Sequence, residues 1–316
     1  MLAFSADKLD GLALRGLEAA GFTVIQGQGL PPGSLPGQAP AAEILIVRST
    51  PVPGDILPQL PALKLILRAG AGTDTIDVAA ARARGIQVSN TPGKNADAVA
   101  ELALGLLLAA DRKIVEGTWA LRQGDWIKGA LGQGMGLTGR TLGVVGFGAA
   151  GRAMAAKARG IGMNVVAWSR GLTPESAAEA GIARAEDPED LARRSDAVSL
   201  HIASTGDTRN LIGTSFFAAL KPGALFVNTS RGEVVDRSAL MQAIRGKGLR
   251  VGLDVFAGEP KAPEAPFADV ELASLSACTP HLGASTDQAS EAVALEVVRI
   301  AVAFRETGIA PNAVKS

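Results

Sequence analysis

The chain has 316 residues, more than a single hydrophobic core usually holds, so we expect two domains with separate cores. Lys and Arg number 31, as do Asp and Glu, so the net charge is zero and no basic field exists to attract nucleic acid or an anionic membrane. One cysteine and two histidines exclude a disulfide framework and are too few for a zinc site, so we expect no bound metal.

The N-terminal residues, MLAFSADKLDGLALRGLEAAGF, lack the basic segment and continuous apolar core of a signal peptide. The longest apolar run, VAELALGLLLAA, contains Glu101 and is too short to span a bilayer. The single cysteine, Cys278, lies in the apolar run SLSACTP, and we interpret it as a small buried core residue rather than a reactive thiol. We therefore expect a cytoplasmic protein whose partner is a small molecule, not nucleic acid or a membrane.

Short apolar runs alternate with helical patterns along the whole chain. Runs rich in Val, Ile and Leu with little polar alternation indicate buried parallel strands. These runs are EILIVRS (43–49), LKLILRAG (63–70), GIQVSN (85–90), TLGVVGFG (141–148), MNVVAWS (163–169), DAVSLHI (196–202), GALFVNTS (223–230) and LRVGLDVF (249–256). Helical spacing that ends in glycine appears in DVAAARARG, GRAMAAKARGIG and RSALMQAIRGKG. This alternation predicts an α/β fold with parallel sheets covered by helices on both faces.

Two segments are expected to connect these elements. Residues 27–40, GQGLPPGSLPGQAP, are rich in Gly and Pro and predict a surface loop. A long helix from about Asp97 to Lys113 leads into residues 116–140, which carry few helix or strand signals. We place a domain boundary near residue 97. If the final helix packs back on the first domain, the domains are 1–96 with 286–316, and 97–285.

A glycine-rich turn follows one predicted strand and precedes a helix. In VVGFGAAG, Gly146, Gly148 and Gly151 form the pattern G-x-G-x-x-G. The first glycine permits a tight turn, the second allows a pyrophosphate to approach the backbone, and the third allows close helix–strand contact. Free N–H groups at the helix start, around Ala149 and Ala150, favour phosphate. The turn therefore predicts dinucleotide binding, with a purely structural turn as the alternative.

The acid that usually grips the adenosine ribose is missing. It is expected about 20 residues after the turn, where this chain has Ser169 followed by Arg170. Serine removes the repulsion of a 2′-phosphate, and arginine pairs well with a phosphate dianion. We therefore expect NADP, or acceptance of both NADP and NAD. The alternative is that Arg170 is a solvated charge and that NAD binds with fewer ribose contacts.

Polar side chains follow several predicted strands. A histidine acid–base must be His201 or His281, since the chain has no other histidine. Arg231, Asp254 and Glu259 also come just after predicted strands, whose carboxyl ends face the ligand crevice in open α/β sheets. An arginine, a carboxylate and a histidine in one crevice can hold a substrate carboxylate and move a proton. Scattered structural ion pairs are the alternative.

The ordered motifs GFGAAG, NTSRGEVVD, LDVFAGEP and TPHLGAST resemble the D-isomer-specific 2-hydroxyacid dehydrogenase family. The resemblance extends to residues 68–112, and so covers nearly the whole chain. It implies two Rossmann-like, doubly wound parallel sheets, a flavodoxin-like substrate-binding domain and a dinucleotide-binding domain, with the active site in the cleft between them. It also implies a homodimer in which the segment between the long helix and Thr141 forms part of the contact.

The family's catalytic triad corresponds to Arg231, Glu259 and His281. The resemblance implies that His281 exchanges a proton with the substrate oxygen, that Glu259 holds the imidazole, and that Arg231 binds the substrate carboxylate. Asp254 corresponds to the partner of the nicotinamide carboxamide. Thr208, Thr229 and Ser230 correspond to positions that line the cofactor, and the backbone at Ala71 and Gly72 corresponds to a carboxylate cradle. We also expect Gly283 and His201 to contact the cofactor; the alternative for His201 is that it only caps its strand. Ala203 departs from the family, where proline is common, and predicts a looser loop near the nicotinamide ribose.

Within the family, the chain is most similar to short forms of D-3-phosphoglycerate dehydrogenase. Arg48 and Arg68 correspond to arginines that bind the substrate phosphate, and Asn95 corresponds to a further substrate contact. The alternative for these arginines is pairing with acids such as Asp74 or Asp77. An NADPH-dependent glyoxylate/hydroxypyruvate reductase is the second functional hypothesis. A dinucleotide-sensing binding protein of the corepressor type is the third.

Overall fold

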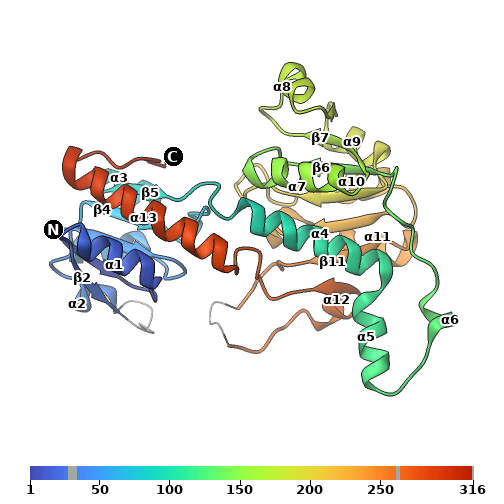
Figure 1. Ribbon diagram of the computed structural model, residues 1–316, viewed down its shortest axis with the longest axis horizontal. Helices are drawn as coiled ribbons and strands as arrows, with labels where there is room; N and C mark the ends of the chain where they lie inside the picture. The colour runs from blue at the N-terminus through green and yellow to red at the C-terminus, as the bar shows by residue number, and fades with distance from the viewer. Residues whose placement is uncertain (28–33, 261–263, 315–316) are drawn as a thin grey trace. The chain divides into compact units, whose positions relative to one another are not determined.

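The computed structural model describes residues 1–27, 34–260 and 264–314. The chain forms two compact units, residues 1–95 with 284–316 and residues 96–283 (Figure 1). The two units divide after residues 95 and 283, whereas the expected domain boundaries were after residues 96 and 285. Each unit is an α/β structure built on its own parallel sheet.

Unit 1 contains a five-stranded parallel sheet in the order β2-β1-β3-β4-β5. Its strands are β1 (Leu2–Ser5), β2 (Thr23–Gln26), β3 (Ile44–Val47), β4 (Leu65–Arg68) and β5 (Gln87–Asn90). Its helices are α1 (Gly11–Ala19), α2 (Leu35–Gln38), η1 (Gly54–Gln59), α3 (Val78–Ala83) and α13 (Asp287–Thr307). Two apolar clusters, one on α1 and α13 and one around η1 and α3, bury this sheet. The strand order is that of flavodoxin-like folds.

The last helix packs against the first one in unit 1 (Figure 1). A Cβ added to Gly16 of α1 would lie 2.8 Å from Cγ2 of Val298 on α13, so glycine permits this close approach. The segment after α13 then follows β5, the edge strand of the sheet. Gln87 Nε2 donates to the carbonyl of Gly308 at 2.7 Å, and the N–H of Val314 donates to Val88 at 2.8 Å. Unit 1 is thus assembled from both ends of the chain.

Unit 2 contains a seven-stranded parallel sheet in the order β12-β11-β10-β9-β6-β7-β8. Its strands are β6 (Thr141–Val145), β7 (Asn164–Trp168), β8 (Ala183–Arg184), β9 (Ala197–Leu200), β10 (Leu225–Asn228), β11 (Arg250–Leu253) and β12 (Ser276–Cys278). Its helices are α4 (Ala96–Arg112), α5 (Ile114–Arg122), α6 (Lys128–Leu131), α7 (Ala149–Gly160), α8 (Pro174–Glu179), α9 (Pro188–Arg194), α10 (Thr214–Ala219), η2 (Gly232–Val234), α11 (Arg237–Lys247) and α12 (Val270–Ser274). The strand order reverses between β6 and β9, which is where such sheets bind dinucleotides.

All eight strands in the sequence-based set are present, but the set was incomplete. It lacked β1, β2 and β8, and it did not include β12, which lies in the apolar run SLSACTP. The expectation of little helix in residues 116–140 was wrong, because α5 reaches residue 122 and α6 spans 128–131. These helices bury few side chains, so they lack a strong apolar stripe. Residues 35–38 of the expected surface loop form α2, and residues 28–33 lie outside the described residues.

The interpretation of Cys278 as a buried core residue was wrong. Cys278 ends β12, the edge strand of the unit 2 sheet, and its side chain is exposed. An edge strand has a neighbour on only one side, so an apolar sequence there does not ensure burial. Among the described residues, no helix is long and apolar enough to cross a membrane.

Candidate active site

The glycine turn of unit 2 joins β6 to α7. Gly146 has a positive φ of 92°, and a Cβ there would lie 2.3 Å from the carbonyl oxygen of His201. A Cβ on Gly151 would lie 2.0 Å from the carbonyl oxygen of Gly146. A Cβ on Gly148, in contrast, would meet no protein atom within 4 Å. Protein packing therefore explains the first and third glycines, and Gly148 leaves the open space that an approaching pyrophosphate needs.

The N-terminus of α7 fits an anion. Gly148 is the N-cap and supplies no capping side chain, and the first turn contains no acidic residue. The N–H of Arg152 bonds to the carbonyl of Gly148 at 2.9 Å, so the N–H groups of Ala149, Ala150 and Gly151 precede that helical bond. Together with the helix dipole, these N–H groups suit the phosphates of a dinucleotide.

Ser169 and Arg170 follow β7, where the ribose-binding acid is missing. Ser169 is half-buried. Arg170 Nη1 lies 3.2 Å from Oδ2 of Asp207, and the two side chains are 67% and 84% exposed. Arg170 is therefore paired with Asp207, but the pair is exposed to solvent. An exposed ion pair of this kind contributes little free energy, so a phosphate can compete for the guanidinium.

His201 follows β9 at the point where the strand order reverses. Its Nε2 lies 2.9 Å from Oγ of Ser199, and burial lowers its pKa to about 4. This lowered pKa favours the neutral form of the His201 imidazole near pH 7. Its Nδ1, and Oγ1 of Thr229 after β10, are buried without a hydrogen-bond partner among the described residues. These two polar atoms fit a site whose hydrogen bonds are completed by a polar ligand such as a dinucleotide.

The loop from Ala203 to Thr208 is held together by the hydroxyl of Thr208. Oγ1 of Thr208 donates to the carbonyl of Ala203 at 2.7 Å and accepts the N–H of Thr205 at 2.7 Å. These bonds bridge the loop despite the absence of the proline that is common in the family. The Thr208 hydroxyl therefore orders the loop, and its expected cofactor contact stays a prediction.

His281 and Glu259 form a short contact. Nδ1 of His281 lies 2.6 Å from Oε2 of Glu259, while Oε1 of Glu259 accepts the N–H of Phe256 at 2.8 Å. The backbone of His281 has a positive φ of 54°, an uncommon conformation for a residue with a side chain. The His281 side chain is 48% exposed, so the imidazole remains accessible on the side away from Glu259.

The charges of this cluster shift its pKa values in opposite directions. The hydrogen bond with Glu259 raises the pKa of His281 above its ordinary value, although burial and the charge of Arg231 oppose this. Burial raises the pKa of Glu259, but the bonds from His281 and the Phe256 N–H outweigh it, so the carboxyl pKa is lowered. Glu259 is therefore ionised and stabilises the charged imidazolium.

Arg231 is held at the end of β10 by a network around Asn228. Asn228 is buried, its Oδ1 accepts both the N–H and the hydroxyl of Ser230, and its Nδ2 donates to the carbonyl of Arg231 at 2.9 Å. Arg231 Nη1 donates to the carbonyl of Ser230 at 2.7 Å. A Cβ on Gly232 would lie 2.1 Å from the carbonyl carbon of Phe256, so the Arg231 loop packs directly on the segment that leads to Glu259. The sequence interpretation missed Asn228, although it directly precedes Thr229 in NTSRGEVVD.

Asp254 organises the loop that carries His281. It is 1% exposed, and its carboxylate accepts the Thr279 hydroxyl at 2.7 Å. It also accepts the N–H groups of Leu282 at 2.6 Å and Gly283 at 2.8 Å. Burial raises the pKa of Asp254. The expected contacts of Asp254 and Gly283 with the cofactor stay predictions.

The substrate-binding residues expected in unit 1 lie at the carboxyl ends of its strands. Arg48 follows β3 and is exposed, and Arg68 ends the neighbouring strand β4, where its Nη1 donates to the carbonyl of Ala69 at 2.6 Å. Ala71 and Gly72 come next in the chain. The backbone of Ala71 is held by Asn90, whose Nδ2 donates to the Ala71 carbonyl at 2.6 Å. Asp77 caps α3 by accepting the N–H of Ala80. Asn95 is half-buried. Asp7, which follows β1 at the carboxyl end of the same sheet, was not among the expected residues, because the sequence analysis did not predict β1.

His281, Glu259 and Arg231 of unit 2 together provide three chemical functions. The imidazole of His281 can give or take a proton, Glu259 stabilises its charged form, and Arg231 supplies positive charge beside both. This set suits a carboxylate-bearing substrate whose neighbouring carbon changes between alcohol and ketone. The glycine turn of the same unit fits a dinucleotide.

Known proteins are similar to this chain in sequence. Residues 104–283 match the family described as D-isomer specific 2-hydroxyacid dehydrogenase, NAD binding domain. The chain is 42% identical to the glyoxylate reductase of Thermococcus litoralis over 269 residues, which are 82% of this chain and 79% of that protein. It is 42% identical to the hydroxypyruvate reductase of Thermotoga maritima over 85% of this chain and 86% of that one. It is also 42% identical to the D-3-phosphoglycerate dehydrogenase of Mycobacterium leprae, over 84% of this chain but 50% of the relative.

Solved structures have the same fold. The TT0316 protein from Thermus thermophilus has a TM-score of 0.87 at 34% identity and covers 100% of both chains. An NADPH-dependent glyoxylate/hydroxypyruvate reductase from Sinorhizobium meliloti, in complex with NADP and malonate, has a TM-score of 0.82 at 27% identity, over 99% of this chain and 96% of that one. The chain belongs to the D-isomer-specific 2-hydroxyacid dehydrogenase family, and it is an enzyme that uses NAD or NADP to interconvert D-2-hydroxy acids and 2-keto acids.

Proposed function

We propose that this enzyme interconverts 3-phosphoglycerate and 3-phosphohydroxypyruvate, the first step of serine biosynthesis, in the cytoplasm. The observation that supports this substrate is the pair of arginines at neighbouring strand ends in unit 1. Val47 pairs with Arg68 in the β3–β4 register, so Arg48 follows directly beside it. Two arginines that lie at the carboxyl ends of neighbouring strands suit a phosphate with a charge near −2.

The proposed mechanism assigns one task to each group. Arg231 and the backbone at Ala71 and Gly72 bind the substrate carboxylate, and Arg48 and Arg68 bind the phosphate. His281 donates a proton to the carbonyl oxygen in reduction and removes the hydroxyl proton in oxidation. Glu259 stabilises the charged imidazolium. When bound, the dinucleotide supplies or accepts the hydride.

The remaining expected residues belong to the same proposal. Unit 2 is the dinucleotide-binding domain and unit 1 the substrate-binding domain. The cofactor is held by the Gly146–Gly151 turn and by residues that follow the other strands of the unit 2 sheet, namely Ser169, Arg170, His201, Thr208, Thr229, Ser230, Asp254 and Gly283. Asn95 contacts the substrate.

The second candidate is an NADPH-dependent glyoxylate/hydroxypyruvate reductase. Two observations favour it. The relatives named glyoxylate reductase and hydroxypyruvate reductase match over most of their own lengths, whereas the phosphoglycerate dehydrogenase relative matches over half. Ser169 and Arg170 also lack the acid that disfavours a 2′-phosphate, so we propose that the enzyme accepts NADP, either alone or together with NAD.

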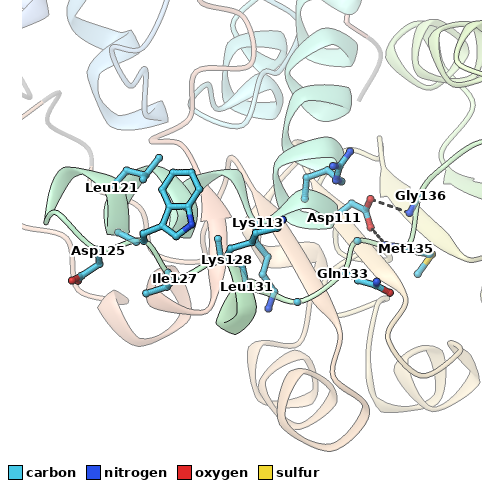
Figure 2. A pocket seen from close by; sticks show the side chains of 16 residues that line it. Asp111, Lys113, Leu121, Asp125, Ile127, Lys128, Leu131, Gln133, Met135 and Gly136 are labelled. Atoms are coloured by element: carbon cyan, nitrogen blue, oxygen red, sulfur yellow. Dashed lines mark hydrogen bonds between the residues drawn. The ribbon is translucent and has the colours of Figure 1, made fainter.

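We further propose that the enzyme is a homodimer whose contact includes residues 113–136 of unit 2. Asp111, at the end of α4, is 1% exposed, and it accepts the N–H groups of Met135 at 2.6 Å and Gly136 at 3.1 Å (Figure 2). Arg250 Nη1 lies 3.2 Å from the same carboxylate. The excursion formed by α5, α6 and their connections is therefore fixed at its two ends, while its middle extends away from the sheet of unit 2 (Figure 1).

The side chains of this excursion support a protein contact. Trp119 is 66% exposed and Trp126 is 81% exposed. A hollow of about 640 Å³ lies within the excursion, and it is lined by both charge signs, including Lys113, Asp125 and Lys128 (Figure 2). Exposed tryptophans are typical of interface hot spots, and a twofold axis lets a surface of mixed charge meet itself.

The experiment that tests the reaction is an initial-rate comparison with purified protein. The substrates are 3-phosphohydroxypyruvate, hydroxypyruvate and glyoxylate, each with NADPH and with NADH. The proposal requires the largest kcat/KM for 3-phosphohydroxypyruvate. A larger kcat/KM for hydroxypyruvate or glyoxylate rejects the phosphate assignment and favours the reductase.

A further inference from the structure

A carboxylate at the end of β1 binds the loop that carries Arg48. Oδ2 of Asp7 accepts three consecutive backbone N–H groups, from Arg48 at 2.5 Å, Ser49 at 3.0 Å and Thr50 at 3.2 Å. Its Oδ1 accepts the hydroxyl of Thr50 at 3.0 Å. The backbone of Asp7 is held in turn, because the buried Ser5 hydroxyl donates to its carbonyl at 2.8 Å.

The strand order explains why Asp7 meets this loop. β1 and β3 are neighbours in the sheet, with Ser5 paired to Ile46, so the residues that follow them emerge side by side. The far end of the loop is also fixed, since the N–H of Val52 donates to the carbonyl of Thr75 at 2.8 Å. The backbone that carries Arg48 is therefore bonded on both sides before any substrate binds.

Three successive N–H groups that converge on one point form an anion-binding concavity. Here an internal carboxylate fills that concavity. A substrate anion at this strand end is therefore left with the guanidinium of Arg48 rather than with the backbone N–H groups. The exposed arginine has a long, mobile side chain, so fixing its backbone removes part of the ordering cost of binding.

We propose that Asp7 is a positioning residue that holds Arg48 for the distal anionic group of the substrate, and so determines selectivity for a phosphorylated 2-keto acid. This inference rests on the proposed function, in which Arg48 binds the substrate phosphate. Asp7 acts through Arg48 and not on the reacting atoms. Its effect is therefore on selectivity between substrates that do and do not carry the phosphate.

The test measures a selectivity ratio, kcat/KM for 3-phosphohydroxypyruvate divided by kcat/KM for hydroxypyruvate. Asp7→Ala removes all four bonds, and we expect the ratio to fall about tenfold, as loss of an oriented charged contact typically causes. Asp7→Asn should restore most of the ratio, because its amide oxygen can take the three N–H groups and its NH₂ can donate to the Thr50 hydroxyl. Thr50→Val is the matched control: it leaves the three backbone bonds in place, so the ratio should change less than about twofold.

Equal loss of kcat/KM for both substrates in Asp7→Ala means that Asp7 only stabilises the fold, and overturns the inference. If Asp7→Ala does not fold, Asp7→Glu keeps the charge but moves the carboxylate by one methylene, and it should lower the ratio in the same direction. An unchanged ratio in Asp7→Glu also overturns the inference.

A double-substitution cycle with Arg48→Met separates this inference from the proposed function. If Asp7 acts through Arg48, adding Asp7→Ala to Arg48→Met should change the ratio less than about twofold. A normal ratio in Arg48→Met alone rejects the phosphate role of Arg48, and with it the proposed substrate. A reduced ratio in Arg48→Met with no change in Asp7→Ala leaves the proposed function intact and rejects only the role of Asp7.

Discussion

The 2.6 Å contact between Glu259 and Nδ1 of His281 sets how the enzyme should respond to pH. In the proposed mechanism, reduction of a keto acid needs the protonated imidazole, because His281 is the residue that donates the proton. The contact raises the pKa of His281 above the ordinary 6.5. The reducing activity is therefore present below the raised pKa and is lost as the pH rises through it.

Replacement of Glu259 by Gln should move this loss of activity to lower pH. Without the carboxylate, the pKa of His281 falls, and we also expect kcat to drop by about 10²-fold or more, the usual contribution of an oriented acid–base group. The measurement is kcat against pH for keto acid reduction. Glu264→Gln, an exposed acid in the same segment, is the control. An unshifted profile in Glu259→Gln contradicts the assigned role.

The ion pair between Arg170 and Asp207 makes a second prediction, about cofactor choice. If Arg170 binds the 2′-phosphate of NADP as proposed, Asp207 competes with this phosphate for the guanidinium and repels it. Asp207→Asn should therefore raise kcat/KM for NADPH relative to NADH by about twofold to fivefold, which corresponds to the modest energy of an exposed pair. The measurement is the ratio of the two kcat/KM values at one salt concentration. A fall in this ratio means that Asp207 assists NADP binding instead.

The residues of the candidate site could be located from the sequence where a short motif carries them, and their chemical roles stay predictions. Arg231, Glu259 and His281 each lie in such a motif, and the structure brings them together in unit 2. Asp207 and Asp7 were not predictable, because their partners lie 37 and 41 residues away in the sequence. Their positions depend on which strands are neighbours, and the motifs do not encode that order.

At the scale of elements, the packing of η2 on the segment after β11 joins two parts of the site. A Cβ on Gly232 would lie 2.1 Å from backbone carbon and 2.2 Å from backbone nitrogen of residues 256 and 257. Neither backbone atom can move as a flexible side chain does. Glycine at this position therefore lets the Arg231 loop and the Glu259 segment approach each other.

Gly232→Ala should push these two elements apart. We expect a loss of about 1–3 kcal/mol of stability, the usual cost of overpacking, and a lower kcat/KM because Arg231 moves with the loop. Thermal unfolding and initial rates measure the two effects. Gly246→Ala on α11 is the matched control, since a Cβ there meets nothing within 4 Å. Unchanged stability and rate in Gly232→Ala contradict the role of this contact.

The elements that the sequence predicted are those with strong apolar patterns. β3, β4, β6 and β10 are central strands buried on both faces, and their runs of Val, Ile, Leu and Phe reflect it. The missed strand β2 is an edge strand with alternating exposure, and β8 has two exposed residues. Strands at the edge of a sheet bury less apolar surface, so composition identifies them less well.

At the scale of the whole molecule, the exposed tryptophans of the α5–α6 excursion make a prediction about assembly. Trp126→Glu places a charge where the proposed dimer buries an aromatic side chain, and it should shift the protein toward monomer. Light scattering coupled to size-exclusion chromatography measures the mass. Leu295→Glu, at a 55% exposed position on α13 of unit 1, should leave the mass unchanged. A monomeric unaltered protein rejects the dimer, and a dimeric Trp126→Glu rejects this residue as an essential part of its contact.

The route of the chain through the two units has a consequence for the order of folding. Residues 96–283 form unit 2 as one continuous stretch, whereas unit 1 needs residues from both chain ends. During synthesis, unit 2 can complete its sheet while α13 and the segment along β5 have not yet left the ribosome. Until α13 is synthesised, the N-terminal strands keep part of their apolar surface uncovered. Uncovered apolar surface of this kind favours aggregation of the nascent chain.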